Sequence, residues 1–211
     1  MINLFQMGKD LAFHGQVLLY LILFCSVVSV AIIIDRFISF HKAGLNAAKF
    51  MSKLSPILKK EKIIEAISLC DKYQSAITRI IKAGILKHDR GKTKIREAME
   101  ERSRLELSQL EKYLPVLSTI AYIAPLLGFL GTVLGMIEVF MQSQSEVEFM
   151  APGDLTAGFG EALFTTAAGL IVAIPIILAH NYFLSRIDGI RQDSGKTTSE
   201  LVDIFPEERA P

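Results

Sequence analysis

Three long apolar runs separate the polar stretches of the chain. Residues 16–34 and 114–137 contain no Asp, Glu, Lys or Arg, and residues 155–182 contain only Glu161. A helix that crosses a bilayer needs about 20 predominantly apolar residues, so each run is long enough to span a membrane. The pattern predicts an all-α membrane protein with three transmembrane helices.

The first run has an alternative interpretation, as the apolar region of a cleaved signal peptide. Such regions are usually about 7–15 residues long, and a cleavage site of small residues follows them. Here the run is longer, and Asp35 and Arg36 follow it. A retained transmembrane helix is therefore the better interpretation.

The polar stretch after the first run also carries apolar residues at helical spacing. Between residues 43 and 90 these are Ile63, Ile64 and Ile67, and then Ile77, Ile80, Ile81 and Ile85. The spacing predicts several short helices, with breaks near Pro56 and at residues 88–91.

From Lys92 the sequence is rich in Glu, Arg, Leu and Lys and has no Gly or Pro up to the second apolar run. We expect one helix from about residue 92 to about residue 144, with about half of its length outside the membrane. Apolar side chains such as Ile95 and Met99 need neighbours there, which long helical extensions packed in an oligomer would supply. For the third helix we expect Asp154 as N-cap and an end near Gln192.

The charges of the loops predict the orientation of the chain in the membrane. The formal net charge is only +1, but the charges are distributed unevenly. Residues 35–112 hold 18 Lys and Arg against 10 Asp and Glu, whereas residues 138–154 hold four acidic residues and no Lys or Arg. Because loops rich in Lys and Arg stay in the cytoplasm, the N-terminus and the acidic loop should lie outside, and the C-terminus should lie in the cytoplasm.

Together these patterns divide the chain into seven segments. In order, they are an outer-face N-terminal segment (1–15), the first span (16–34), a cytoplasmic helical domain (35–113), the second span (114–137), a periplasmic loop (138–154), the third span (155–182) and a cytoplasmic tail (183–211).

The second and third spans each carry a face of small residues at helical spacing. On the second span the face consists of Ser118, Ala121, Pro125, Gly128, Thr132 and Gly135. On the third span it consists of Gly158, Ala162, Thr165 or Thr166, Gly169 and Ala173. Small residues let membrane helices approach closely, so one interpretation of these faces is helix packing alone.

Three polar features favour a functional interpretation as well. Each small-residue face carries a threonine near the middle of its span, and Glu161 lies about two turns into the third span, where an ionisable group is costly and usually functional. Glu138 lies at the end of the second span and is better explained as a solvated helix-end carboxylate. No nucleophile–base pair or metal-ligand cluster is evident, so we predict no catalytic residues, no metal and no cofactor.

At these residues the chain resembles the MotA/TolQ/ExbB proton-channel family. The runs that carry the resemblance are APLLGFLGTVLGMIEVF (residues 124–140) and GEALFTTAAGLIVAIPIILAHNYFLSRID (residues 160–188). Three spans with a large cytoplasmic insertion after the first are similar to ExbB and TolQ, whereas the flagellar stator subunit has four spans.

The resemblance implies a multi-pass protein of the bacterial inner membrane that forms a ring-shaped homopentamer in lipid. The ring would enclose the transmembrane helices of two copies of an ExbD- or TolR-like single-span partner, whose intramembrane aspartate takes up and releases protons. A TonB- or TolA-like protein would use the energy for outer-membrane processes such as TonB-dependent transport. No nucleic acid is implied.

The resemblance also implies roles for individual residues. Thr132, Thr166 and Glu161 match positions of the family's proton pathway, and Thr165 is a second hydroxyl beside it whose role is open. The small residues would let the central helices approach and move, and they are Pro125, Gly128, Gly135, Ala162, Gly169 and Ala173. An ExbB-type role is favoured over a TolQ-type role in envelope maintenance, and a non-conducting membrane scaffold is a further alternative. A membrane enzyme is disfavoured.

The predicted orientation can be tested by cysteine labelling in intact cells. A membrane-impermeant thiol reagent added from outside should label Ser145→Cys and miss Lys94→Cys, because the charges place these positions on opposite sides of the membrane. The reverse labelling pattern would overturn the orientation.

Overall fold

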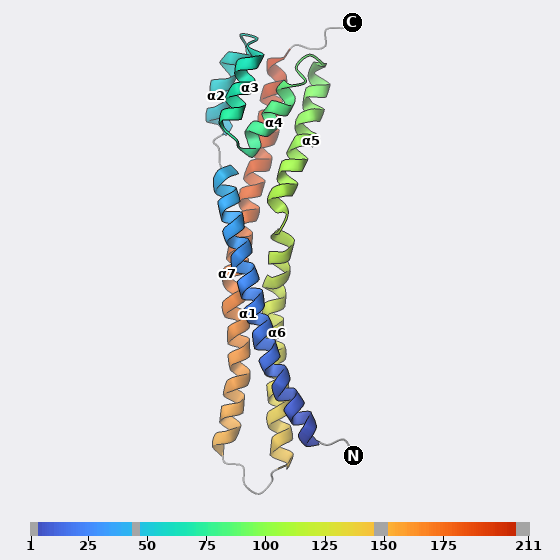
Figure 1. Ribbon diagram of the computed structural model, residues 1–211, viewed down its shortest axis with the longest axis vertical. Coiled ribbons are helices and arrows are strands. Elements are labelled where there is room, and N and C mark those ends of the chain that lie inside the picture. Colours follow the sequence, from blue (N-terminus) through green and yellow to red (C-terminus); the bar gives the residue numbers. More distant parts are fainter. Residues whose placement is uncertain (1–3, 44–46, 146–151, 206–211) are drawn as a thin grey trace. The chain divides into compact units, whose positions relative to one another are not determined.

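In the computed structural model, residues 4–43, 47–145 and 152–205 are described, and their regular elements are all α-helices (Figure 1). In chain order the helices are α1 (Leu4–Ala43), α2 (Ala47–Leu58), α3 (Ile63–Lys72), α4 (Ala76–Ile85), α5 (Gly91–Glu111), α6 (Leu114–Ser145) and α7 (Pro152–Ile204). The chain divides into two compact units. We call residues 1–34 and 114–181 the apolar unit, and residues 35–113 and 182–211 the polar unit.

The prediction of three membrane-spanning helices is confirmed. Segments long and apolar enough to cross a membrane lie within Gln16–Phe40, Gly91–Met141 and Ala162–Ile204. The individual segment boundaries predicted from the sequence remain predictions, as does the placement of residues 1–15 on the outer face.

The predicted ends of the third helix are wrong at both sides. α7 begins at Pro152, so Asp154 lies inside the helix and is not its N-cap. Proline suits the first helical position because the N–H that it lacks would have no intrahelical acceptor there. The helix also continues past Gln192 to Ile204, because Leu201 and Val202 are buried in the core of the polar unit.

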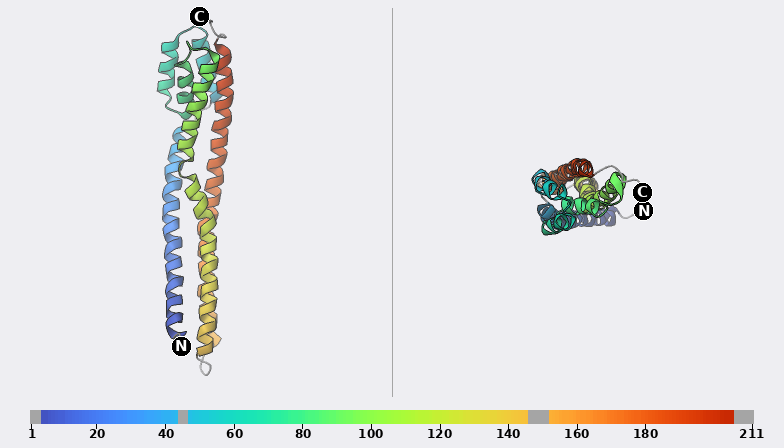
Figure 2. Two further views of the ribbon diagram at one scale, coloured as in Figure 1. Left: turned by 90° about the vertical axis from the view of Figure 1, so that its right-hand side faces the viewer. Right: turned by 90° about the horizontal axis from the view of Figure 1, so that it is seen from above.

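In the polar unit, α2, α3, α4, α5 and the end of α7 lie together (Figure 2). Their buried side chains form one hydrophobic core. Its fully buried side chains include Leu54, Ile80, Ile81, Ile85, Ile95, Met99 and Leu201. At Gly84, α4 lies close to side chains of α5 and α7. A β-carbon there would be 2.6 Å from Met99 Sδ and 2.9 Å from Leu201 Cδ2. The short helices predicted from the isoleucine spacing are therefore held by one shared core.

The breaks between the short helices fall close to the predicted places. Pro56 lies inside α2, and the break follows it at residues 59–62, where Glu61 has a positive φ of 54°. A positive φ is uncommon for a residue other than glycine and ends the helix. The second predicted break separates α4 from α5 at residues 86–90.

The single helix predicted from residue 92 to 144 is wrong, because the chain leaves the helical path at Lys112 and Tyr113. Pro115 has no N–H to donate to the Glu111 carbonyl, and its ring crowds the preceding turn. The end of α5 is capped instead by Arg36 of α1. Its Nη1 donates to the carbonyl oxygens of Gln109 at 3.0 Å and Leu110 at 3.2 Å.

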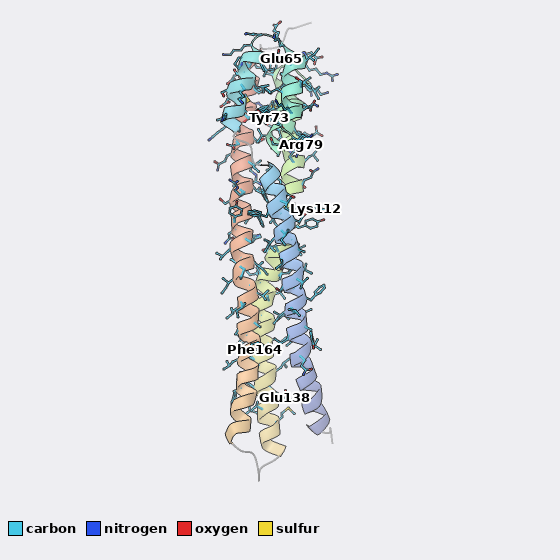
Figure 3. All side chains as sticks on the ribbon, turned by 60° about the vertical axis from the view of Figure 1, so that its left-hand side comes forward. Glu65, Tyr73, Arg79, Lys112, Glu138 and Phe164 are labelled. Carbon is cyan, nitrogen blue, oxygen red and sulfur yellow. The ribbon has the colours of Figure 1, made fainter. Side chains whose placement is uncertain are left out.

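A buried carboxylate joins α4 to α5 in the polar unit. Glu106 is 2% exposed and accepts hydrogen bonds from Arg79 Nε at 2.8 Å and Nη2 at 2.5 Å. Arg102 Nη2 lies 2.6 Å from the same carboxylate. The hydrogen bond to Glu106 raises the pKa of Arg79, against the opposing effect of its partial burial. Figure 3 labels Arg79 on its helix.

We predict that Glu106→Gln destabilises the polar unit. The amide cannot accept from both guanidinium groups as the carboxylate does, so the free energy of unfolding should fall by about 1–3 kcal/mol. Thermal unfolding of the purified protein in detergent measures the change. The control is Glu97→Gln, because Glu97 pairs with Lys94 on the surface and such pairs contribute at most about 1 kcal/mol. Equal losses in the two variants would contradict the assigned role of Glu106.

Candidate functional site

The candidate site is the interface between α6 and α7 in the apolar unit, where the two backbones come into contact. A β-carbon added at Gly169 of α7 would lie 2.5 Å from the carbonyl oxygen of Ala124. One added at Gly128 of α6 would lie 2.8 Å from the carbonyl oxygen of Thr165. No side chain fits at either position, so glycine is required for the helices to approach this closely.

The small-residue faces predicted on the two spans thus meet one another within one chain. Gly135 lies against Ala162, since a β-carbon at Gly135 would be 2.8 Å from Ala162 Cβ. Ala162 and Ala173 are buried, and Pro125 is half-buried. Contact of the same residues with partner helices stays a prediction.

Two of the predicted hydroxyl groups form a pair across this interface. Thr132 Oγ1 of α6 is hydrogen-bonded to Thr166 Oγ1 of α7, and Thr166 Oγ1 donates to the Gly128 carbonyl at 2.9 Å. Thr132 Oγ1 also lies 3.2 Å from the Gly128 carbonyl oxygen and 3.3 Å from the Ala162 carbonyl oxygen, so either threonine can be the donor of the bond between them. Each hydroxyl has two lone pairs, so the threonine pair can also accept a hydrogen bond from another group.

The third threonine, Thr165, takes part in helix packing. It is 3% exposed, and its Oγ1 donates to the Ala162 carbonyl at 2.7 Å. A β-carbon at Gly131 would lie 2.5 Å from this oxygen. Its Oγ1 also lies 3.2 Å from the Gly128 carbonyl of α6, so this hydroxyl is used inside the interface like those of Thr132 and Thr166, but Thr165 is more deeply buried than Thr166.

Sequence reasoning missed Gly131 and Ala124 as members of the interface. Both are buried, and each lies three or four residues from Gly128, so they widen its small-residue face. The available signal was the second glycine in the run GFLGT, at the i+3 position from Gly128.

The predicted carboxylate of the site is only partly described. Glu161 lies within α7, but its side chain is outside the described part of the structure, so its role stays a prediction. Glu138, on α6, is half-buried (Figure 3). In the part of the chain that the structure describes, no group of three or more His, Cys, Asp or Glu residues could hold a metal ion.

Comparison with known proteins connects this interface to a family. The sequence model of the MotA/TolQ/ExbB proton channel family matches residues 72–194, which include α6 and the threonines of α7.

The relatives that resemble this chain are named either TolQ or ExbB. The Tol-Pal system protein TolQ of Haemophilus influenzae is 36% identical over 112 residues, which are 51% of this chain and 47% of that protein. The putative biopolymer transport protein ExbB-like 3 of Synechocystis sp. is 30% identical over 162 residues, 76% of this chain and 77% of that protein. A putative ExbB homolog of Methanothermobacter thermautotrophicus is 27% identical over 188 residues, 89% of this chain and 66% of that protein. The match thus spans about half of the TolQ relative and about two thirds of the Methanothermobacter one.

We predict that Gly169→Ala separates α6 from α7. Its β-carbon would meet a backbone carbonyl, which cannot rotate away, so the overpacking should cost about 1–3 kcal/mol of stability. The matched control is Gly160→Ala in the same helix, where no atom lies within 4 Å of an added β-carbon. Alanine there should be neutral or stabilising by up to about 1 kcal/mol. The thermal midpoint and the yield of folded protein in detergent measure both effects, and similar values for the two variants would contradict the contact.

Proposed function

This chain belongs to the MotA/TolQ/ExbB proton channel family, and we propose that it is the multi-span subunit of a proton-driven complex in a bacterial inner membrane. Together with an ExbD- or TolR-like single-span partner, it would couple the proton-motive force to outer-membrane processes such as TonB-dependent transport. The subunit itself carries out no chemical reaction on a substrate.

The observation that carries this proposal is the hydroxyl pair of Thr132 and Thr166 in the apolar unit. A partner aspartate that carries protons needs polar contacts in both of its protonation states. A hydroxyl can accept from the protonated acid through a lone pair, and by turning it can donate to the carboxylate. A fixed positive charge would hold the aspartate ionised, whereas a purely apolar surface would leave it unsolvated.

The energy available is sufficient to drive such a cycle. Moving one charge across 100 mV releases about 2.3 kcal/mol. Each unit of pH difference adds about 1.4 kcal/mol. These energies are comparable with the about 1–3 kcal/mol cost of breaking and remaking a buried hydrogen bond.

The proposed assembly is a homopentamer around two partner helices. Three helices of one chain are too few to enclose a channel, and α6 and α7 already use their small faces on each other. Several copies must therefore contribute their remaining surfaces to a centre, which would be completed by the partner and coupled to a TonB- or TolA-like protein. The loop charges favour the proposed orientation, with the N-terminus in the periplasm and the C-terminus in the cytoplasm.

Of the two branches, we propose the ExbB-type role. The match to the ExbB-like protein of Synechocystis sp. extends over more of this chain than the match to TolQ of Haemophilus influenzae. A TolQ-type role in envelope maintenance is the alternative within the same mechanism.

A non-conducting scaffold is a second candidate, favoured by one observation. Every hydroxyl of the three threonines has a hydrogen-bond partner inside the chain, so helix packing alone accounts for their burial. The scaffold hypothesis predicts that these hydroxyls affect stability and not proton-dependent activity.

We predict that the double variant Thr132→Val, Thr166→Val assembles with its partner but loses proton-driven activity. Valine keeps the shape of threonine, while the partner carboxylate loses its hydroxyl contacts at a cost of about 1–3 kcal/mol or more. The measurements are oligomer yield and activity that depends on the proton-motive force. The matched control is Thr165→Val, which removes the hydroxyl used in packing and should lower thermal stability with activity retained. Normal activity in the double variant would contradict the role of these hydroxyls in proton transfer and would favour the scaffold hypothesis.

A third variant, Glu161→Gln, assigns the role of the carboxylate. If Glu161 relays protons, its activity should fall as far as that of the double threonine variant. If Glu161 only shapes the entrance, the loss should be smaller.

A further inference from the structure

A cavity with a basic lining lies in the polar unit, between side chains of α3, α4 and α5. α4 packs against both of the other helices (Figure 1). The volume of the cavity is about 590 Å³. Sites for small molecules have volumes of about 300–1,000 Å³, so the cavity is large enough for a ligand. Three of the residues that line it are cations, namely Arg79 and Lys82 of α4 and Arg102 of α5.

The two arginines are held in place by one buried carboxylate. Arg79 donates to Glu106 through Nε and Nη2, and Arg102 Nη2 lies 2.6 Å from the same carboxylate. Glu106 is 2% exposed, whereas the side chains of Arg79 and Arg102 are 42% and 39% exposed. The carboxylate thus orients two guanidinium groups that solvent can reach, and together the three groups carry one surplus positive charge.

Arg79 keeps donors for a further acceptor. A guanidinium group has five N–H groups. Arg79 uses Nε–H and one N–H of Nη2 on Glu106, and one N–H of Nη1 on the Gln74 carbonyl oxygen at 3.1 Å. The second N–H of Nη1 and that of Nη2 can therefore donate to a ligand, and the guanidinium group that carries them is already oriented.

Lys82 adds a third cation to the lining. Its Nζ lies 2.5 Å from Asp71 Oδ1, and the side chain of Asp71 is 57% exposed. Ion pairs this exposed to solvent are weak, so Asp71 can turn into water and release Lys82 to another anion. Cys70 also lines the cavity, but burial raises the pKa of its thiol to about 12, so the thiol stays protonated and adds no negative charge.

The start of α4 favours an anion as well. α4 begins at Ala76, and Gln74 and Thr78 both line the cavity. Backbone dipoles give the N-terminal end of a helix a partial positive charge. Ser75 Oγ already accepts from the Thr78 N–H, so the helix acts here through its dipole and not through that donor.

We propose that the cavity binds the phosphate group of a small, water-soluble phosphate monoester through Arg79, Arg102 and Lys82. A phosphate monoester has three terminal oxygen atoms and nearly two negative charges at neutral pH, which two guanidinium groups and one ammonium group can match. A carboxylate has only two oxygen atoms, which a single guanidinium group would occupy. Ala83 and Leu86 also line the cavity, and their apolar side chains can contact the rest of the molecule.

The first test measures binding by titration calorimetry on the full-length protein in detergent, in a phosphate-free buffer of constant ionic strength. We expect one phenyl phosphate per chain, with an affinity about tenfold higher than that of benzoate, which carries the same ring on a carboxylate. Because a ligand that binds only the folded protein stabilises it, phenyl phosphate should also raise the thermal midpoint. Equal affinities for the two compounds, or no binding of phenyl phosphate, would overturn the proposal.

A lipid headgroup is another source of phosphate, since basic pockets of membrane proteins also bind headgroups. The probe for it is dihexanoyl phosphatidylglycerol, a soluble short-chain lipid whose phosphodiester has fewer free oxygen atoms and less charge than a monoester. We therefore expect it to bind more weakly than phenyl phosphate. Tighter binding of the lipid would assign the cavity to a headgroup and overturn the proposal of a water-soluble ligand.

A carboxylate introduced into the lining tests the position of the site. Leu86 is 55% exposed, so Leu86→Asp should keep its thermal midpoint without ligand, while its negative charge should repel phosphate and lower the affinity about tenfold. The matched control is Ile64→Asp on α3, since Ile64 is 86% exposed and lies outside the lining. Its affinity for phenyl phosphate should not change. Equal affinities in the two variants would place the phosphate elsewhere and overturn the proposal.

A second pair of variants tests the ammonium group. Lys82→Gln should lower the affinity for phenyl phosphate about fivefold, because a charge-assisted hydrogen bond is lost. The control is Lys94→Gln, since Lys94 pairs with Glu97 on the surface outside the lining and its loss should leave the affinity unchanged. Unchanged affinity in Lys82→Gln would contradict its assigned contact. These experiments measure binding and not proton flux, so their failure would leave the proposed function untouched.

Discussion

The contact between the backbones of α6 and α7 is the constraint on which the apolar unit depends. Apolar side chains alone do not drive helices together in lipid, because lipid tails are as apolar as leucine. Association must come from close packing and hydrogen bonds. Both need small residues at the contact, so that the two backbones can approach closely. Gly128 and Gly169 meet this need, since a β-carbon at either would strike a carbonyl oxygen of the opposite helix.

The same close approach brings the threonine hydroxyls within hydrogen-bonding distance of the opposite backbone. Thr166 donates to the Gly128 carbonyl and is bonded to Thr132, so the pair stabilises the interface. Because each hydroxyl has two lone pairs, the pair can also accept a hydrogen bond from a further group. The proposed proton transfer would therefore use groups that also stabilise the interface, and the buried Thr165 takes part in the packing as well.

The polar unit is held by a different kind of interaction. Its core is apolar, but two charged contacts fix its helices at their ends and sides. Arg36 satisfies carbonyl groups at the end of α5, and Glu106 holds two arginines from α4 and α5. This contact is costly to break from the arginine side, because the buried carboxylate would be left as an uncompensated charge.

Spacing along the sequence was enough to predict the three spans, the short helices around Ile80 and the small-residue faces, because each depends on the period of a single helix. Only the tertiary structure decided which residues meet. The spacing of small residues tells which side of α6 contains Gly128. It does not tell which residues of α7 lie opposite, so Gly131 and its contact with Thr165 were missed. Pro115 was a signal in the sequence for the break after Glu111. The group that caps the end of α5 there is Arg36, which lies 73 residues before Gln109. A local pattern cannot specify such a contact, because it forms only when distant segments fold together.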